Sequence, residues 1–304
     1  MPKNKNVRYG IGEWYGQLFY DINPAEKSRL AFIKTTKDIK CPYRNDLQSC
    51  NKSGGVCTMV SYELLDNGRA RIDENRPDFV ALCPNRFWQN NTIFKEIGKT
   101  LLGTEYPTLI KEVNFLQKVD YQGEVQKEYV GKIDLILTKL STNEKIVDWC
   151  GLEIQAVYFS GSSMSNEFAE IKKNPSELLF PAKNRRPDFR SSGPKRLAPQ
   201  LETKVPTLRR WGKKMAIVID KSFFESLAPM KKVTSLSNAD IAWFIVGYEN
   251  RQREIKVRST IFTTLESSVE GLTAGEPISK EKFEIELQGY LTGKRDKLIR
   301  LFNQ

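Results

Sequence analysis

The chain of 304 residues contains no histidine. Imidazole is the general base or the metal ligand in Ser-His-Asp and Cys-His hydrolases, in His-metal nucleases, in phospholipase-D-type phosphodiesterases and in His-containing zinc fingers. Its absence excludes all of these classes. Hydrolytic chemistry in this chain must therefore use carboxylates with a hard metal ion.

Long apolar runs are also missing. Ile241–Tyr248 is among the longest, and a bilayer-spanning helix needs about 20 apolar residues. The first eight residues, MPKNKNVR, contain no apolar segment of the signal-peptide type. We therefore expect a soluble cytosolic protein.

Acidic side chains are fewer than basic ones, 37 against 48, so the net charge is +11. A basic surplus of this size favours a polyanionic partner, either nucleic acid or an anionic membrane surface.

Cysteines are few, yet four of the five lie close together in the sequence, at Cys41, Cys50, Cys57 and Cys83. Disulfides are not expected in the cytoplasm, whereas four thiolates suit tetrahedral zinc or iron. Four protein ligands leave no open position for a reacting water, so such a site would be structural. The alternative is four unrelated buried thiols. Cys150 stands apart, and we expect it to be a small core residue.

Two apolar, β-branched stretches carry polar side chains where a buried strand would normally have none. They are Gly131-Lys-Ile-Asp134-Leu-Ile-Leu and Gly151-Leu-Glu153-Ile-Gln155-Ala-Val. In a strand, residues two apart point the same way, so Glu153 and Gln155 share one face. If the two strands pair, the three polar groups converge in the layout of a divalent-metal nuclease site. The alternative is that each carboxylate lies on the solvated face of a half-buried sheet.

Two basic segments are candidate DNA contacts. Asp66-Asn67-Gly68 predicts a β-hairpin turn, and the segment 181–196 is a proline-rich basic loop without helix or strand periodicity. Their basic residues could contact phosphates or bases, although a solvated hairpin and a solvated flexible loop are the alternatives. The candidates are Arg69, Arg71, Arg76, Lys183, Arg185, Arg186, Arg190, Lys195 and Arg196.

Periodicity predicts helices over 92–102, with Thr92 as N-cap, and over 107–118, with Pro107 at the first position. The second helix would carry Glu112, either as a further site carboxylate or as a residue of a solvated face. The segments 213–220 and 241–248 predict buried strands, and 280–303 a helical segment broken near Gly289 and Gly293. Together these elements predict an α/β (α+β) fold with a mixed sheet flanked by helices.

Several motifs together carry a family resemblance. Cys41-Pro-Tyr, Cys50, Gly55-Val-Cys57-Thr, Leu82-Cys83-Pro-Asn-Arg-Phe, Gly151-Leu-Glu153-Ile-Gln155-Ala-Val and Lys195-Arg-Leu-Ala-Pro-Gln200 occur in this order. This combination resembles the restriction endonucleases of the NotI/EagI type, over residues 40–220.

The resemblance implies a PD-D/E-x-K nuclease core in residues 92–304, with DNA-recognition loops, preceded in residues 1–91 by an N-terminal arm and a four-cysteine metal module. It further implies a type II restriction endonuclease that acts as a homodimer on palindromic, GC-rich double-stranded DNA, with a companion methyltransferase protecting host sites. Such an enzyme would work in the prokaryotic cytoplasm and would have no membrane partner. Asp134, Glu153 and Gln155 would be the active-site positions, and Mg²⁺ would bind Asp134 and Glu153. Glu112 is a fourth candidate because of its place before the Asp134 strand, and the matching motifs do not include it. Cys41, Cys50, Cys57 and Cys83 would hold structural iron or zinc.

Gln155 stands where such sites usually have lysine, and a neutral amide cannot accept a proton from water, so its role would be positional. Two other functions remain open from the sequence. One is a repair or recombination nuclease of the same fold, and the other is a non-catalytic, metal-pinned DNA-binding protein.

Overall fold

The computed structural model describes residues 6–33, 39–46, 48–67, 69–72, 79–161, 163–249, 253–275, 278–293 and 299. The chain divides into two units, Met1–Thr273 and Ala274–Gln304. Among the described residues of the second unit is one helix, α8 (Lys280–Thr292), whose N-terminus is capped by the Ser279 hydroxyl. It passes through Gly289 without a break and ends before Gly293, so only the second of the two expected interruptions is present.

The first unit begins with a small antiparallel sheet, in the order β2-β1-β3-β4, with β5 also paired to β3. Its strands are β1 (Val7–Trp14), β2 (Gln17–Leu18), β3 (Val56–Leu64), β4 (Ala70–Ile72) and β5 (Val80–Ala81). β3 and β4 pair antiparallel through Leu64 and Ala70, which confirms the expected hairpin around Asn67. Side chains of β1 and β3 form a core with helix α1 (Pro24–Ala31) and α3 (Ser165–Lys173) on the sheet.

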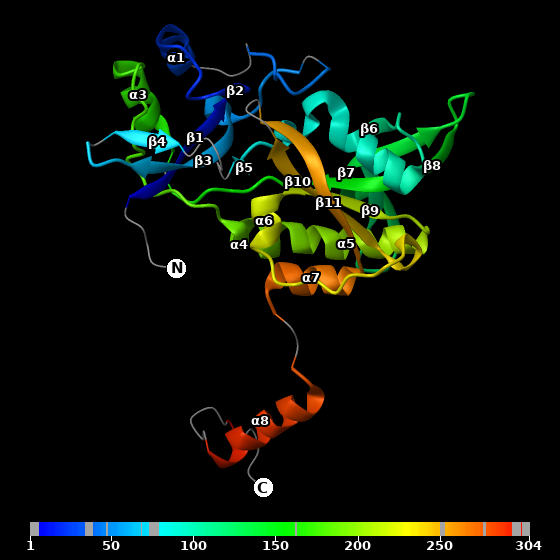
Figure 1. The fold of residues 1–304 in the computed structure, drawn as a ribbon. Coiled ribbons are helices and arrows are strands. Elements are labelled where there is room, and N and C mark those ends of the chain that lie inside the picture. Colours follow the sequence, from blue (N-terminus) through cyan, green and yellow to red (C-terminus); the bar gives the residue numbers. More distant parts are fainter. Residues whose placement is uncertain are drawn as a thin grey trace. The chain divides into compact units, whose positions relative to one another are not determined.

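A larger, mixed sheet has the order β11-β10-β9-β8-β7-β6 (Figure 1). β9 runs parallel to both of its neighbours, β8 and β10, while the other pairs are antiparallel. All six residues of β9 and the first seven of β10 are buried, as expected of continuous apolar strands covered on both faces. The strands are β6 (Thr108–Val119), β7 (Val125–Leu140), β8 (Ile146–Ile154), β9 (Met215–Asp220), β10 (Ile241–Glu249) and β11 (Glu254–Thr263).

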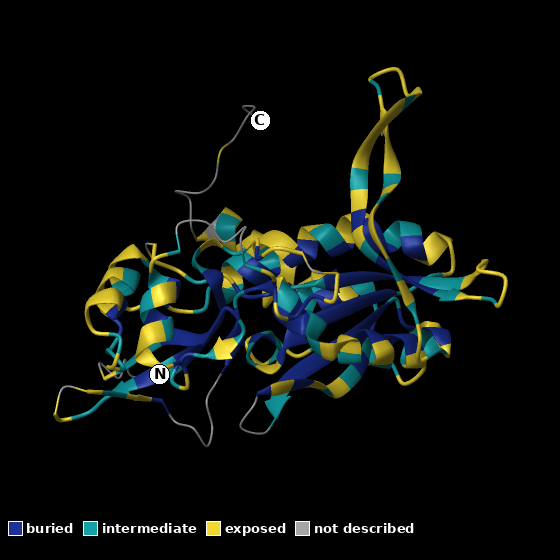
Figure 2. Cartoon of the chain, turned by 90° about the horizontal axis from the view of Figure 1, so that it is seen from above, coloured by how far each residue is buried: buried dark blue, intermediate teal, exposed yellow. Residues whose placement is uncertain are grey.

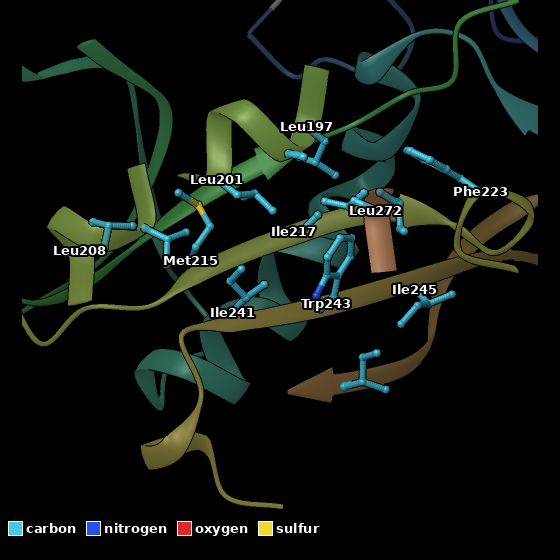
Figure 3. Close-up of a cluster of buried hydrophobic side chains, with 14 of the residues drawn as sticks. Leu197, Leu201, Leu208, Met215, Ile217, Phe223, Ile241, Trp243, Ile245 and Leu272 are labelled. Atoms are coloured by element: carbon cyan, nitrogen blue, oxygen red, sulfur yellow. The ribbon is translucent and has the colours of Figure 1, made fainter. Parts of the chain in front are cut away.

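Helices cover both faces of this sheet. On one face, α5 (Ala198–Arg210), α6 (Lys221–Glu225) and α7 (Leu265–Thr273) pack against side chains of β9 and β10; Figure 3 shows Leu201, Met215, Ile217 and Trp243 in this cluster. On the other face lie η3 (Pro84–Asn91), α2 (Thr92–Ile97) and the π-helical turn η4 (Gly98–Leu102). Cys150 belongs to this second core and is 1 % exposed, as expected.

The helix expected over 107–118 is wrong, because these residues form β6, which pairs with β7. The apolar positions of this segment suit either structure, and the neighbouring strand β7 supplies a ladder that a helix could not use. The distal half of the β6–β7 hairpin is mostly exposed and extends from the body of the unit (Figure 2). The helix over 92–102 is confirmed, although Thr92 is its first residue and Asn91 its cap.

The basic segment 181–196 is irregular only in its first half. From Phe189 it continues as α4 (Phe189–Ser192) and the π-helical turn η5 (Gly193–Leu197), which lead directly into α5. The Asp188 carboxylate caps α4 by accepting hydrogen bonds from the backbone N–H and hydroxyl of Ser191. Two short 3₁₀ turns, η2 (Ser53–Gly55) and η6 (Leu236–Asn238), complete the described elements. Among the described residues, no helix is long and apolar enough to cross a membrane.

Candidate active site

The two polar-bearing stretches pair as neighbouring antiparallel strands. Leu135 of β7 faces Leu152 of β8, and this register places Asp134 directly opposite Glu153. The same two strands also bury Ile136, Leu137 and Leu152 in the two cores. The expectation that the stretches pair is therefore confirmed, and the sheet brings the two carboxylates together.

The environments of the two carboxylates differ. Glu153 is buried, whereas the Asp134 side chain is 63 % exposed. The pKa of Glu153 is raised to about 7, because burial disfavours its charged form and the Asp134 carboxylate lies close, against the opposing effect of the Lys204 ammonium. A pair of carboxylates in such a position has the chemistry to bind a divalent cation, which would relieve their mutual repulsion.

A third acid, on β6, extends the pair into a row of three carboxylates on neighbouring strands, the carboxylate row. Lys111 faces Leu135, and Val113 faces Ile133, so Glu112 lies opposite Asp134 in the ladder. Its backbone has φ +57°, in the left-handed region that a non-glycine residue rarely adopts. Backbone strain of this kind costs about 1–3 kcal/mol and is concentrated at functional sites.

At the same point of the β6–β7 hairpin, the side chains of both strands change from one hydrophobic core to the other. Leu109 and Leu135 pack against the core on the α2 face, whereas Val113 and Ile133 pack against the core on the α5 face. The Glu112 side chain itself is 72 % exposed and accepts a hydrogen bond from Lys132 Nζ at 3.1 Å. Glu112 is thus on a strand rather than on the expected helix, but it remains next to Asp134.

Gln155 follows directly after β8, and its side chain makes a local contact. The amide Nε2 donates a hydrogen bond to the backbone oxygen of Ala156 at 2.6 Å, while its backbone N–H bonds to the Val218 oxygen at 3.0 Å. The side-chain amide group therefore does not donate to Glu153 in this structure.

The cation beside the carboxylates is one that the sequence did not indicate, Lys204 of α5. Its ammonium donates to Glu153 Oε1 and, at 3.1 Å, to Gln200 Oε1, and it lies 3.9 Å from Asp134 Oδ2. A signal did exist, because Lys204 occupies a position of the buried stripe of α5 formed by Leu201, Val205 and Leu208. A lysine in such a stripe needs a buried acid as partner.

The four clustered cysteines are all buried and free of disulfides. The Cys57 backbone oxygen accepts hydrogen bonds from the N–H groups of Leu82, at 2.9 Å, and Cys83, at 3.1 Å, which holds the loop of Cys83 against β3. Burial raises the pKa of Cys50, Cys57 and Cys83, and their charged forms would repel one another and that of Cys41. The thiols thus face a common region, although among the described residues no three Cys, Asp or Glu side chains stand close enough to hold a metal ion as placed.

A buried arginine joins this cysteine region to both sheets. Arg86, which follows Cys83 by three residues, is fully buried and donates to Glu13 Oε2 at 2.7 Å. It also donates to Gln89 Oε1 at 2.9 Å and to the backbone oxygen of Arg253. The arginine of the Cys-Pro-Asn-Arg motif is therefore a structural link between β1 and the turn before β11.

The structure places the candidate DNA contacts in different environments. Arg71 is exposed and paired with Glu63 at 2.8 Å, and Arg196 donates to the Tyr158 hydroxyl at 2.7 Å while its guanidinium lies over that ring. Arg185 is buried and bound to Glu167 and the Ser163 oxygen, so it holds its loop against α3. Arg76 lies outside the described residues. The other candidates are exposed, namely Arg69, Lys183, Arg186, Arg190 and Lys195.

Comparison with known proteins gives one finding. The family model described as restriction endonuclease NotI matches residues 26–258, which is more than half of the chain. No curated protein matches the chain. The matched range includes the four clustered cysteines, the carboxylate row and Lys204, and it confirms the resemblance inferred from the sequence motifs.

Proposed function

We propose how the active site works in this chain, which belongs to the NotI restriction endonuclease family and is therefore a type II, site-specific deoxyribonuclease that binds double-stranded DNA. The proposal is that it hydrolyses phosphodiester bonds with Mg²⁺, using Asp134 and Glu153 as metal ligands. The observation that carries it is the ladder position of Asp134 opposite Glu153, at the border between buried and exposed parts of the sheet.

The carboxylate pair fits a hard divalent cation. Mg²⁺ takes oxygen ligands and commonly uses one or two carboxylates while keeping several waters, and the open side of Asp134 leaves room for water and phosphate. When bound, the cation would make a water more acidic and stabilise negative charge on the phosphate. Glu112 is a third carboxylate of the same row and is proposed as an outer member of the site.

The chain's own residues position the reacting groups. Lys204 holds one oxygen of buried Glu153, and so fixes the orientation of that carboxylate. The proton of the attacking water cannot pass to Gln155, because an amide is not a base, so Gln155 is proposed to position the strand end rather than to transfer a proton.

The DNA is proposed to run past the segment from Lys183 to Arg196 and the β3–β4 hairpin. Lys183, Arg186, Arg190 and Lys195 are exposed and suited to phosphate contacts. Arg185 has no part in this proposal, since it is buried in its pair with Glu167.

Residues 1–91 are proposed to form a module held by structural iron or zinc at the four cysteines, and 92–304 the nuclease core. What supports the metal is the common region that the thiols face and the affinity of four thiolates for these ions. The proposed working form is a homodimer on palindromic DNA, with a companion methyltransferase protecting host sites.

The test is to incubate the protein with long duplex DNA and Mg²⁺ and to map the ends of the fragments. Discrete fragments with ends at one palindromic sequence are expected. Asp134→Ala and Glu153→Ala should abolish cutting while DNA binding persists. Full activity in the Glu153→Ala protein, or cutting without a divalent cation, would contradict the proposal.

A further inference from the structure

Helix α5 brings one charged side chain into an apolar interface. Leu201, Val205 and Leu208 pack into the core on this face of the sheet, and Lys204 lies among them with 6 % of its surface exposed. A buried ammonium costs several kcal/mol unless it is paired and hydrogen-bonded. The groups that the Lys204 ammonium binds must therefore offset the cost of burying it beside Asp134 and Glu153.

The donors of Lys204 are not all used by the protein contacts described above. An ammonium has three N–H donors, and two of them reach Glu153 and Gln200. The Asp134 oxygen at 3.9 Å is too distant for a hydrogen bond. Among the described residues, one N–H donor of Lys204 is thus left without a hydrogen-bond partner, and the exposed Asp134 carboxylate lies 3.9 Å from the ammonium.

The sequence position two residues after Glu153 supplies no cation. Gln155 is neutral, and its amide group donates to the Ala156 oxygen rather than toward the acids. The nearest positive charge to both Asp134 and Glu153 among the described residues is Lys204, which comes from another element 51 positions along the chain from Glu153.

We propose that Lys204 is a catalytic residue of this nuclease, whose free N–H donates to a non-bridging oxygen of the scissile phosphate. This inference rests on the proposed function of Asp134 and Glu153. Glu153 and Gln200 hold the ammonium in place, so it is oriented before the substrate arrives. A fixed cation in a partly water-excluded site stabilises the charge that develops on the phosphate oxygens in the transition state. Lys204 thereby supplies the positive charge that Gln155 cannot.

The test compares Lys204→Gln with a matched control, Lys213→Gln, which removes another lysine bound to a carboxylate of β8, Asp148. Removal of one preorganised donor typically lowers kcat about 100- to 1,000-fold, and we expect this loss for Lys204→Gln with nearly unchanged KM. We expect the control to lie within about threefold of wild type. The double variant Gln155→Lys/Lys204→Gln returns an amine to the strand face of Glu153 and should recover at least tenfold in kcat.

Thermal unfolding shows whether each variant folds. If Lys204→Gln does not fold, Lys204→Arg is used instead, because it retains the positive charge. We expect its planar guanidinium to use its donors on Glu153 and Gln200 and to leave none for the phosphate, so kcat should fall at least tenfold with KM unchanged. Cutting by a folded Lys204→Gln protein at the wild-type rate, or wild-type kcat in Lys204→Arg if only that variant folds, would overturn the inference. A wild-type protein that does not cut with Mg²⁺ would instead overturn the proposed function.

Discussion

The proposed DNA path makes a quantitative prediction about salt. Four exposed basic residues follow one another along the segment before and within η5, namely Lys183, Arg186, Arg190 and Lys195. Each phosphate contact that a protein makes releases counterions, so the plot of log K against log salt has a negative slope whose magnitude grows by about 0.9 per contact. If all four residues contact phosphates, replacing them together by Gln should reduce the magnitude of this slope by roughly 3.6.

The magnitude follows from this slope. Between 50 and 200 mM salt, four contacts weaken binding by roughly 150-fold, and the quadruple variant should lose that part of the salt dependence. Binding is measured by fluorescence anisotropy with a labelled duplex, in a buffer without Mg²⁺ so that the DNA stays intact.

The control must lower the net charge equally, because long-range attraction alone depends on the charge of the whole protein. Four other exposed lysines serve this purpose, Lys221, Lys231, Lys232 and Lys280. Replacing them by Gln should leave the slope near that of wild type. Equal slopes in wild type and in the variant of the basic segment would refute the proposed path.

Three further changes test individual residues. Arg86→Ala leaves Glu13 buried without its cation, and should lower the free energy of unfolding in urea by about 3–5 kcal/mol; a loss below about 1 kcal/mol would contradict this role. Asp220→Asn should lower the free energy of unfolding by about 1–3 kcal/mol, because asparagine has a single acceptor oxygen and its NH₂ group must then face the N–H of Ala81 or of Phe223, whose hydrogen bond it cannot accept. Since burial raises the pKa of Asp220, this carboxyl makes wild-type stability fall as pH rises through the raised value, and the variant should lack that slope in urea unfolding at several pH values. Glu112→Gln should raise the Mg²⁺ concentration needed for half-maximal cutting by about tenfold, and an unchanged requirement would remove Glu112 from the site.

Continuous apolar runs predict strands correctly in this chain, whereas an amphipathic segment that suits either a helix or a strand is predicted wrongly. The segments 213–220 and 241–248 are continuous apolar runs, and such runs have few alternatives once both faces are covered. The apolar spacing of the segment 107–118 predicts a helix, and this prediction is wrong because pairing with β7 decides the structure of the segment. Pairing between strands is a tertiary property that no local pattern contains.

The same distinction applies to the candidate active site. Asp134 and Glu153 could be predicted because each acid interrupts an apolar strand, and their pairing brings them together. Lys204 could not be placed, because its contact with Glu153 depends on how α5 lies across the sheet. The buried stripe of α5 gave a hint, but its meaning required the position of the facing strand.

The exposure of the carboxylate row changes stepwise across three strands, and this gradient would make the proposed site both rigid and accessible. Glu153 is buried and held by Lys204, so its orientation is fixed before any ligand arrives. Asp134 and Glu112 are mostly exposed, at the point where the β6–β7 hairpin passes from one core to the other. A phosphate and a cation approaching from solvent would therefore meet the exposed ends of two acids and the buried, fixed end of a third. An entirely buried row would exclude the DNA backbone, and an entirely exposed one would leave no group oriented in advance for the transition state.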